Sequence, residues 1–210
     1  MVRVKICGFT NVSDAKEAIE LGVDALGLVF FAASPRHVTV QTAKQIAAIV
    51  PPFTQTVGLF VNATEQEVRE VLRQVPLDVL QFHGDESPEF CRLFARPYIK
   101  AVRVNEAADI ELASKRFYDA RALLFDAHVE GVYGGTGKAF DWQMLPQDLK
   151  QAWVLSGGLH PDNVTEAIRK TGAVAVDVSS GVEAAKGIKD AQKMRQFIQG
   201  VKRAGTEFTE

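Results

Sequence analysis

The stretch VRVKICGFTNVSDAKEAIELGVDALGLVF, residues 2–30, contains the unit from which the fold is built. Its two apolar, β-branched runs, 2–6 and 25–30, have the length of buried strands, and the segment 12–21 between them has helical periodicity. Gly22 follows that segment at the position where a helix C-terminal glycine belongs. Strand, helix and strand in this order predict a βαβ unit with parallel strands.

The same alternation continues to the end of the chain. Further strands are expected at 56–61, 79–82, 98–102, 122–125, 152–155 and 173–176, and further helices at 39–49, 65–74, 88–94, 106–116, 161–170 and 190–202. One such unit takes roughly 24 residues, so eight units need about 190. Open doubly wound sheets usually have five or six strands. We therefore predict an α/β protein with a single (β/α)8 TIM barrel domain, 1–210.

Composition and charge exclude several functions. The 24 Lys+Arg and 26 Asp+Glu leave a net charge of −2, without the basic footprint that nucleic acids require. The longest apolar run, 25–33, is shorter than the roughly 18 residues of a membrane span, and the first residues do not form a secretory signal. We expect a cytoplasmic protein with no nucleic-acid or membrane partner.

The cysteines and histidines do not indicate a disulfide or a metal site. Cys7 and Cys91 lack the spacing of a disulfide framework or zinc site, and the four histidines lack metal-ligand spacing.

Unusual residues gather where the expected strands end, which is where TIM barrels place their active sites. They are Cys7, 34–36, His83, Asp126, 156–158, Asp177 and 179–181. Gly157, Gly158 and Gly181 allow backbone N–H groups to approach an anion, and a short helix beginning near Ser180 points its positive end at the same place. These loops follow the seventh and eighth strands, so phosphate binding is favoured over plain turn glycines.

Two of these residues suit acid–base chemistry. Asp126 ends an apolar strand, where partial desolvation favours a general acid, although a capping role is the alternative. Cys7 is either an inert buried thiol or a base facing the ligand from the first strand. Lys5 lies on the same strand face, and its ammonium is expected to lower the pKa of the thiol.

Arg36 and Asp177 have two interpretations each. The Arg36 guanidinium, after the stiff Pro35, either clasps a carboxylate or is solvated at the surface. Asp177 either accepts hydrogen bonds from a sugar hydroxyl or caps a turn. The glycine-rich segment 131–139 departs from a P-loop in glycine spacing and lacks the Ser or Thr after Lys138, so we interpret 131–141 as a lid over the site.

From end to end, the chain resembles the phosphoribosylanthranilate isomerase family of tryptophan biosynthesis. The resemblance depends on nine segments in order: VKICG at 4–8, SPR at 34–36, QFHG at 81–84, GGTGK at 134–138, FDW at 140–142, SGGL at 156–159, PDNV at 161–164, DVSSGVE at 177–183 and GIKD at 187–190. His37 and Phe9 depart from the family pattern, which affects loop packing rather than chemistry.

The resemblance implies an Amadori rearrangement of N-(5-phosphoribosyl)anthranilate to 1-(2-carboxyphenylamino)-1-deoxy-D-ribulose 5-phosphate. The family's general acid falls on Asp126 and its general base on Cys7. Arg36 is then expected to hold the anthranilate carboxylate, Asp177 to orient the sugar or amino group, and the loops with Gly157, Gly158, Ser180 and Gly181 to bind phosphate. His83 is assigned to the wall of the substrate site. The only partner expected is the phosphosugar substrate, with no cofactor or metal, and the chain is a monomer or a homodimer.

Three alternatives remain open. The homologous barrel isomerase of histidine biosynthesis uses an aspartate as the base at the end of the first strand, so Cys7 argues against it. A phosphosugar-binding barrel without turnover would not need both Cys7 and Asp126. The third alternative is that this barrel is one half of a fusion with indole-glycerol-phosphate synthase. Met1 directly before the first strand and the short polar tail 204–210 favour a stand-alone chain instead.

Overall fold

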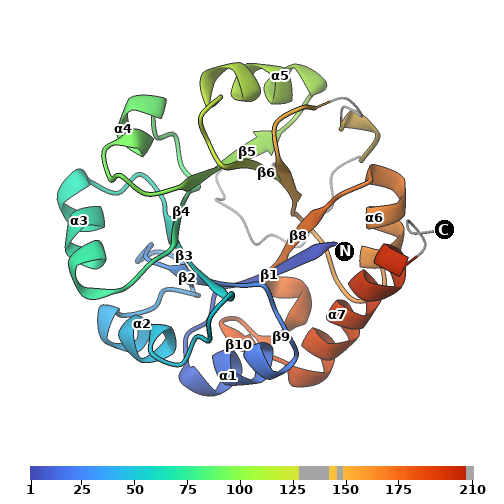
Figure 1. The fold of residues 1–210 in the computed structure, drawn as a ribbon, viewed down its shortest axis with the longest axis horizontal. Coiled ribbons are helices and arrows are strands. Elements are labelled where there is room, and N and C mark those ends of the chain that lie inside the picture. Colours follow the sequence, from blue (N-terminus) through green and yellow to red (C-terminus); the bar gives the residue numbers. More distant parts are fainter. Residues whose placement is uncertain (128–141, 146–148, 207–210) are drawn as a thin grey trace.

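Eight parallel strands close into a barrel in chain order, β1 to β8 (Figure 1). The structure is a computed structural model that describes residues 1–127, 142–145 and 149–206. The strands are β1 (Arg3–Cys7), β2 (Ala25–Val29), β3 (Gln55–Phe60), β4 (Val79–Phe82), β5 (Tyr98–Val104), β6 (Ala122–Ala127), β7 (Trp153–Leu155) and β8 (Ala175–Val178). All eight overlap the expected runs, although the eighth begins two residues later than expected, and the predicted TIM barrel is confirmed. Pairing of β1 with both β2 and β8 closes it.

The helices surround the barrel (Figure 1). They are α1 (Val12–Glu20), α2 (Val40–Ala47), α3 (Glu65–Gln74), α4 (Pro88–Arg92), α5 (Ala107–Arg116), α6 (Val164–Thr171) and α7 (Ala191–Thr206), with 3-10 turns η1 (Trp142–Met144) and η2 (Ser180–Val182). The described part of the chain has only η1 between β6 and β7. Among the described helices, none is long and apolar enough to cross a membrane.

Local capping explains where several helices begin. Thr64 and Glu67 form the reciprocal capping box that begins α3, and Ser87 caps α4 with Pro88 in its first turn. The prediction that α6 begins at Pro161 is wrong by three residues. The Asn163 side chain accepts from His160 N and donates to Gly158 O, at 2.8 and 2.9 Å. These bonds hold Pro161 in the preceding turn, and the helix begins at Val164.

The strands bury two different faces. Outward side chains such as Ile6, Leu26 and Phe125 pack with the helices in the main core. Fully burying one such side chain contributes about 1.5–3 kcal/mol. Inward, small apolar side chains such as Val57 and Ala122 fill the barrel next to buried polar groups. A buried polar group is costly unless it has a partner, so these interior groups need specific pairs.

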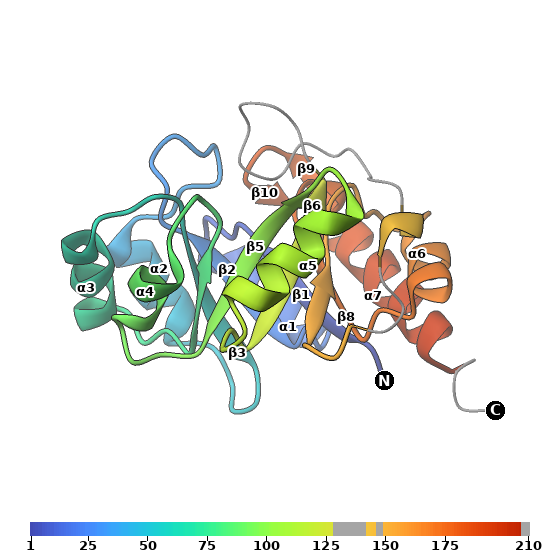
Figure 2. The ribbon, with the colours of Figure 1, turned by 90° about the horizontal axis from the view of Figure 1, so that it is seen from above.

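An antiparallel hairpin that the sequence patterns did not indicate follows η2. Its strands are β9 (Glu183–Ala185) and β10 (Ile188–Lys189). Figure 2 shows it on the side of the barrel opposite the amino terminus, at the same end as the loop between β2 and α2. Strands of three and two residues are too short to produce a period-two pattern, which is why the sequence analysis missed them.

Candidate active site

The expected acid, base and sugar-contacting residues are buried at the carboxyl ends of their strands. Cys7 is the last residue of β1, His83 directly follows β4, Asp126 lies one residue before the end of β6, and Asp177 lies in β8. Each is at most 7% exposed. Because the barrel is closed, strand ends that are distant in sequence surround one axis.

Lys5 forms a buried ion pair with Asp177. Lys5 Nζ lies 2.9 Å from Asp177 Oδ1, and the two residues are register partners on β1 and β8. Burial alone would lower the pKa of Lys5. The charges of Asp177 and Cys7 outweigh burial and hold this pKa above its ordinary value. The family resemblance implies that Asp177 orients the sugar or the amino group. The structure additionally assigns it a partner within the protein, one strand away.

The Cys7 thiol lies among these charges. Burial is the largest influence and raises its pKa, Lys5 and Lys189 lower it, and Asp177 raises it. The expected effect of Lys5 is therefore present, but burial outweighs it and the pKa of Cys7 is above that of an ordinary thiol. The Cys7 side chain lies over Gly27 of β2, where an added Cβ would be 2.6 Å from the sulfur. Only glycine leaves this thiol enough room.

A chain of three side chains leads from β4 to Asp126. Gln81 Nε2 lies 3.0 Å from His83 Nδ1, and His83 Nε2 lies 3.2 Å from Asp126 Oδ2. Gln81 is fully buried, and its Oε1 has no hydrogen-bond partner in the described part of the chain. His83, expected in the wall of the site, therefore contacts the candidate acid directly.

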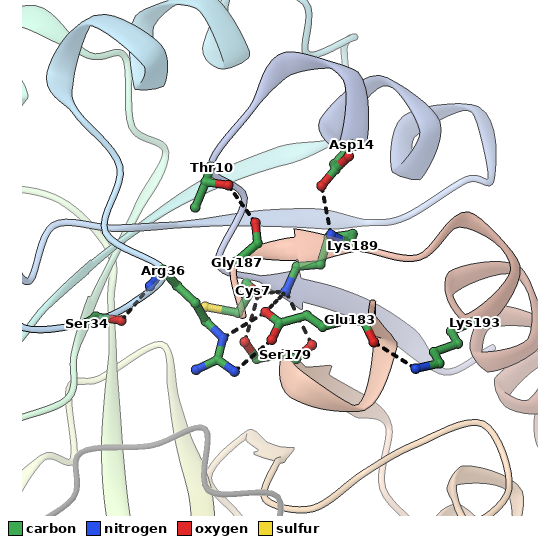
Figure 3. Close-up of polar contacts among 10 residues, drawn as sticks. All are labelled: Cys7, Thr10, Asp14, Ser34, Arg36, Ser179, Glu183, Gly187, Lys189 and Lys193. Carbon is green, nitrogen blue, oxygen red and sulfur yellow. Dashed lines mark hydrogen bonds and ion pairs between the residues drawn. The ribbon is translucent and has the colours of Figure 1, made fainter. Parts of the chain in front are cut away.

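Arg36 is bound side-on by a carboxylate that the sequence analysis did not single out (Figure 3). Its Nε and Nη2 donate to Glu183 Oε1 and Oε2, both at 2.8 Å. The Arg36 side chain is 11% exposed, so the alternative of a solvated surface arginine is wrong. Lys189 Nζ reaches the same Glu183 Oε1 at 2.9 Å and donates to Cys7 O at 2.6 Å. Burial alone would raise the pKa of Glu183, but Arg36 and Lys189 hold it below its ordinary value.

The two loops expected to bind phosphate are in contact. Gly157 and Gly158 have φ of +83° and +65°, a conformation that glycine adopts without a Cβ penalty. A Cβ added to Gly181 would collide with the carbonyl of Leu159, so the loop after β8 lies directly against the loop after β7. Ser180 begins η2 as expected near that position. Backbone groups of both loops are therefore available to one anion.

The proposed lid 131–141 lies outside the described residues. Three residues that the sequence does not single out, Gln81, Glu183 and Lys189, lie inside motifs that carry the family resemblance. Motif membership does not predict their individual contacts. Within 1–127, 142–145 and 149–206, no group of three or more His, Cys, Asp and Glu side chains could hold a metal ion.

Comparison with known proteins connects this site to a family. Residues 4–200 match the family described as N-(5'phosphoribosyl)anthranilate (PRA) isomerase. A protein of that name from Neisseria meningitidis is 55% identical over 197 residues, 94% of this chain and 95% of the relative. The one from Thiobacillus denitrificans is 56% identical over 201 residues, 96% and 98% of the two chains.

Solved structures of the same family are also similar to this chain. The crystal structure of phosphoribosyl anthranilate isomerase from Thermotoga maritima matches this chain with a TM-score of 0.89 and 42% identity. A crystal structure of phosphoribosyl anthranilate isomerase in complex with reduced 1-(o-carboxyphenylamino)-1-deoxyribulose 5-phosphate matches with a TM-score of 0.86 and 41% identity. Each match covers 97% of this chain and 100% of the other. Monomers generated from the dimeric Thermotoga maritima enzyme give 0.86 at 39% identity, with the same coverage. The chain belongs to the N-(5'-phosphoribosyl)anthranilate isomerase family.

Proposed function

We propose that this chain catalyses the Amadori rearrangement of N-(5-phosphoribosyl)anthranilate to 1-(2-carboxyphenylamino)-1-deoxy-D-ribulose 5-phosphate in tryptophan biosynthesis. The observation that carries the proposal is a buried thiol, Cys7, and a buried carboxyl, Asp126, at the carboxyl end of one closed barrel. The reaction needs an acid and a base on one bound sugar, and the two strands that carry these residues, β1 and β6, lie three places apart around the ring.

The first step opens the sugar ring. Asp126 donates its proton to the furanose oxygen while the C1′–O4′ bond breaks, and the amino nitrogen lone pair forms a protonated Schiff base with C1′. The Asp126 carboxylate then accepts the hydrogen bond from His83. An ionised acceptor receives a stronger hydrogen bond than a neutral one, so His83 stabilises the product of this proton transfer.

The second step moves a proton from carbon. The Cys7 thiolate removes the proton from C2′, and the electrons of the C2′–H bond form a C1′=C2′ enolamine that neutralises the nitrogen. Tautomerisation of the enolamine gives the ketone. Lys5 and Lys189 stabilise the thiolate that this step requires. Proton transfers of this kind need neither a redox cofactor nor a metal.

Substrate orientation follows from the surrounding groups. Arg36 holds the anthranilate carboxylate through the edge of its guanidinium that Glu183 does not use. Asp177 orients the sugar or the amino group, and backbone N–H groups near Gly157, Gly158, Ser180 and Gly181 bind the phosphate. The proposal includes a single barrel domain, 1–210, and a cytoplasmic location.

A fluorescence-detected turnover assay on freshly generated phosphoribosylanthranilate tests the proposal. Cys7→Ser and Asp126→Asn should each lower kcat at least ~10²-fold. Cys91→Ser removes a buried thiol in α4 and is the control for Cys7→Ser. Asp162→Asn removes an exposed carboxylate and is the control for Asp126→Asn. Both controls should retain kcat. Wild type that binds a reduced product analogue but gives no turnover would instead identify a phosphosugar-binding protein.

Two further measurements test substrate choice and assembly. Turnover of the corresponding substrate of histidine biosynthesis would reveal the related isomerase activity, which the thiol at position 7 disfavours. For assembly, we infer a monomer or a homodimer. The dimeric Thermotoga maritima relative favours the homodimer. Light scattering at several concentrations distinguishes the mass of one chain from that of two.

A further inference from the structure

We propose that Glu183 is a positioning residue for the substrate carboxylate, acting through Arg36, and that Lys189 fixes Glu183 for this task. The inference rests on the proposed function, because it requires that Arg36 bind the carboxylate of the aminobenzoate ring. It adds a role for two residues of the β9–β10 hairpin. Neither residue needs to touch the substrate.

Glu183 determines which edge of the guanidinium remains for a ligand. Its two oxygens occupy Nε and Nη2, the side of the fork, at 2.8 Å each. Two parallel hydrogen bonds fix both the position and the plane of the group. The end edge, formed by Nη1 and the second hydrogen of Nη2, has the same two-donor geometry and suits a second carboxylate.

The aliphatic part of the Arg36 side chain is also fixed in position. A Cβ added to Gly8 would lie 2.7 Å from Arg36 Cδ, and Gly8 has φ of +85°, so the arginine stem lies directly on the backbone after Cys7. The Arg36 backbone N–H donates to the Ser34 hydroxyl at 3.1 Å, which orders the loop after β2. The guanidinium therefore has a defined place relative to the candidate base.

Lys189 connects Glu183 to the strand ends. Its ammonium, fully buried, donates to Glu183 Oε1 at 2.9 Å, Cys7 O at 2.6 Å and Ser179 O at 3.2 Å (Figure 3). One side chain thus ties the hairpin to the ends of β1 and β8. Further bonds fix the hairpin, since Lys193 Nζ donates to Glu183 O at 2.7 Å and Lys189 N donates to Asp14 Oδ2 at 2.7 Å.

Charge counting gives Lys189 a second role. Arg36 and Glu183 alone would sum to zero, which weakens the attraction of Arg36 for an anionic ligand. With Lys189 the three groups carry a net charge of +1 in a buried setting, where charge interactions are only weakly screened by solvent. The cluster is therefore both rigid and attractive to a carboxylate before substrate arrives. Such preorganisation reduces the entropic cost of binding.

The test compares two ligands rather than one. One is the reduced product analogue with its ring carboxylate, and the other is the same molecule with an unsubstituted phenylamino ring. We expect Glu183→Gln to weaken binding of the carboxylated ligand about tenfold or more and to leave the other ligand unchanged. A neutral amide no longer fixes the guanidinium plane, and this loss of positioning outweighs the added positive charge. In turnover, KM should rise more than kcat falls. Glu65→Gln removes an exposed carboxylate paired with Arg69 and is the control.

Each outcome decides the proposal. Equal loss for both ligands, or no loss for either, overturns it and leaves Glu183 a structural role. Arg36→Gln must lose the carboxylated ligand selectively; if it does not, the carboxylate role of Arg36 in the proposed function fails as well. If only Arg36→Gln is selective, the role of Glu183 alone fails. Glu183→Asp keeps the charge and should recover part of the affinity, and it replaces Glu183→Gln in the comparison if the amide variant does not fold.

Discussion

His83 contacts Asp126 with one ring nitrogen and Gln81 with the other, at 3.2 Å from Nε2 to Oδ2 and 3.0 Å from Nδ1 to Nε2. An amide nitrogen can only donate, so this contact favours the His83 tautomer in which Nδ1 accepts and Nε2 carries the proton. Nε2–H then points at the Asp126 carboxyl. Gln81, which is buried behind the ring, therefore sets the tautomer that the acid requires.

Removing the Gln81 amide should impair catalysis without impairing binding. We expect Gln81→Met, similar in length and apolar, to lower kcat about tenfold with KM little changed, since the tautomer no longer has a fixed preference. Nitrogen NMR of the His83 ring should report Nε2–H in the wild type and a mixture in the variant. An unchanged tautomer together with unchanged kcat would contradict this role.

The Lys5–Cys7 arrangement predicts a particular pH dependence. Burial raises the pKa of Cys7, so the thiol is protonated at neutral pH in the free enzyme. Below that pKa the thiolate fraction rises about tenfold per pH unit, and kcat/KM should rise with it. Lys5 lowers the pKa of the thiol, so Lys5→Met should shift the rise to still higher pH. It also leaves Asp177 without its ion-pair partner.

Thiolate absorbance and the pH profile of kcat/KM measure this shift separately. Lys16→Met changes an exposed lysine of α1 and should leave both curves in place. A Lys5→Met variant whose thiol titrates like that of the wild type would show that the ammonium does not act on Cys7.

The strands and the site residues at their ends were readable from the sequence for one physical reason. Each buried strand is an apolar run, and the closed barrel brings the residue after each run to the same end. Cys7, His83, Asp126 and Asp177 were found in this way. Side-chain pairs between segments distant in sequence were not readable, because Lys5 and Asp177 are 172 residues apart and Arg36 and Glu183 are 147 apart. No local pattern encodes such pairs, and β10, with two residues, has no periodicity at all.

The contact between the two phosphate loops can be tested at Gly181. A Cβ there collides with the carbonyl of Leu159, so Gly181→Ala must push the loops after β7 and β8 apart. We expect a loss of about 1–3 kcal/mol in the free energy of unfolding and weaker competitive inhibition by inorganic phosphate. The Cβ that Gly205→Ala adds in α7 has no neighbour closer than 3.7 Å among the described residues, so this control should be neutral or stabilising. Unchanged phosphate affinity in Gly181→Ala would separate this loop from the phosphate site.

Stability at acid pH should depend on Asp119. Hydrogen bonds from Arg92 and then Tyr98 lower the pKa of Asp119 to about 2. An unfolded Asp titrates near ~3.9, so the contribution is complete above that pH and is lost as the pH falls from about 4 towards 2. Both partners are partly exposed, 38% for Arg92 and 30% for Asp119, so solvent screening limits the contribution to about 1 kcal/mol or less.

Urea unfolding tests this contribution. The free energy of unfolding of Asp119→Asn should be lower than that of the wild type at pH 7, and this deficit should shrink below pH 4. Asp162→Asn, which removes an exposed carboxylate, is the control and should show no deficit. A deficit that is the same at every pH would mean that Asp119 acts through packing rather than through its charge.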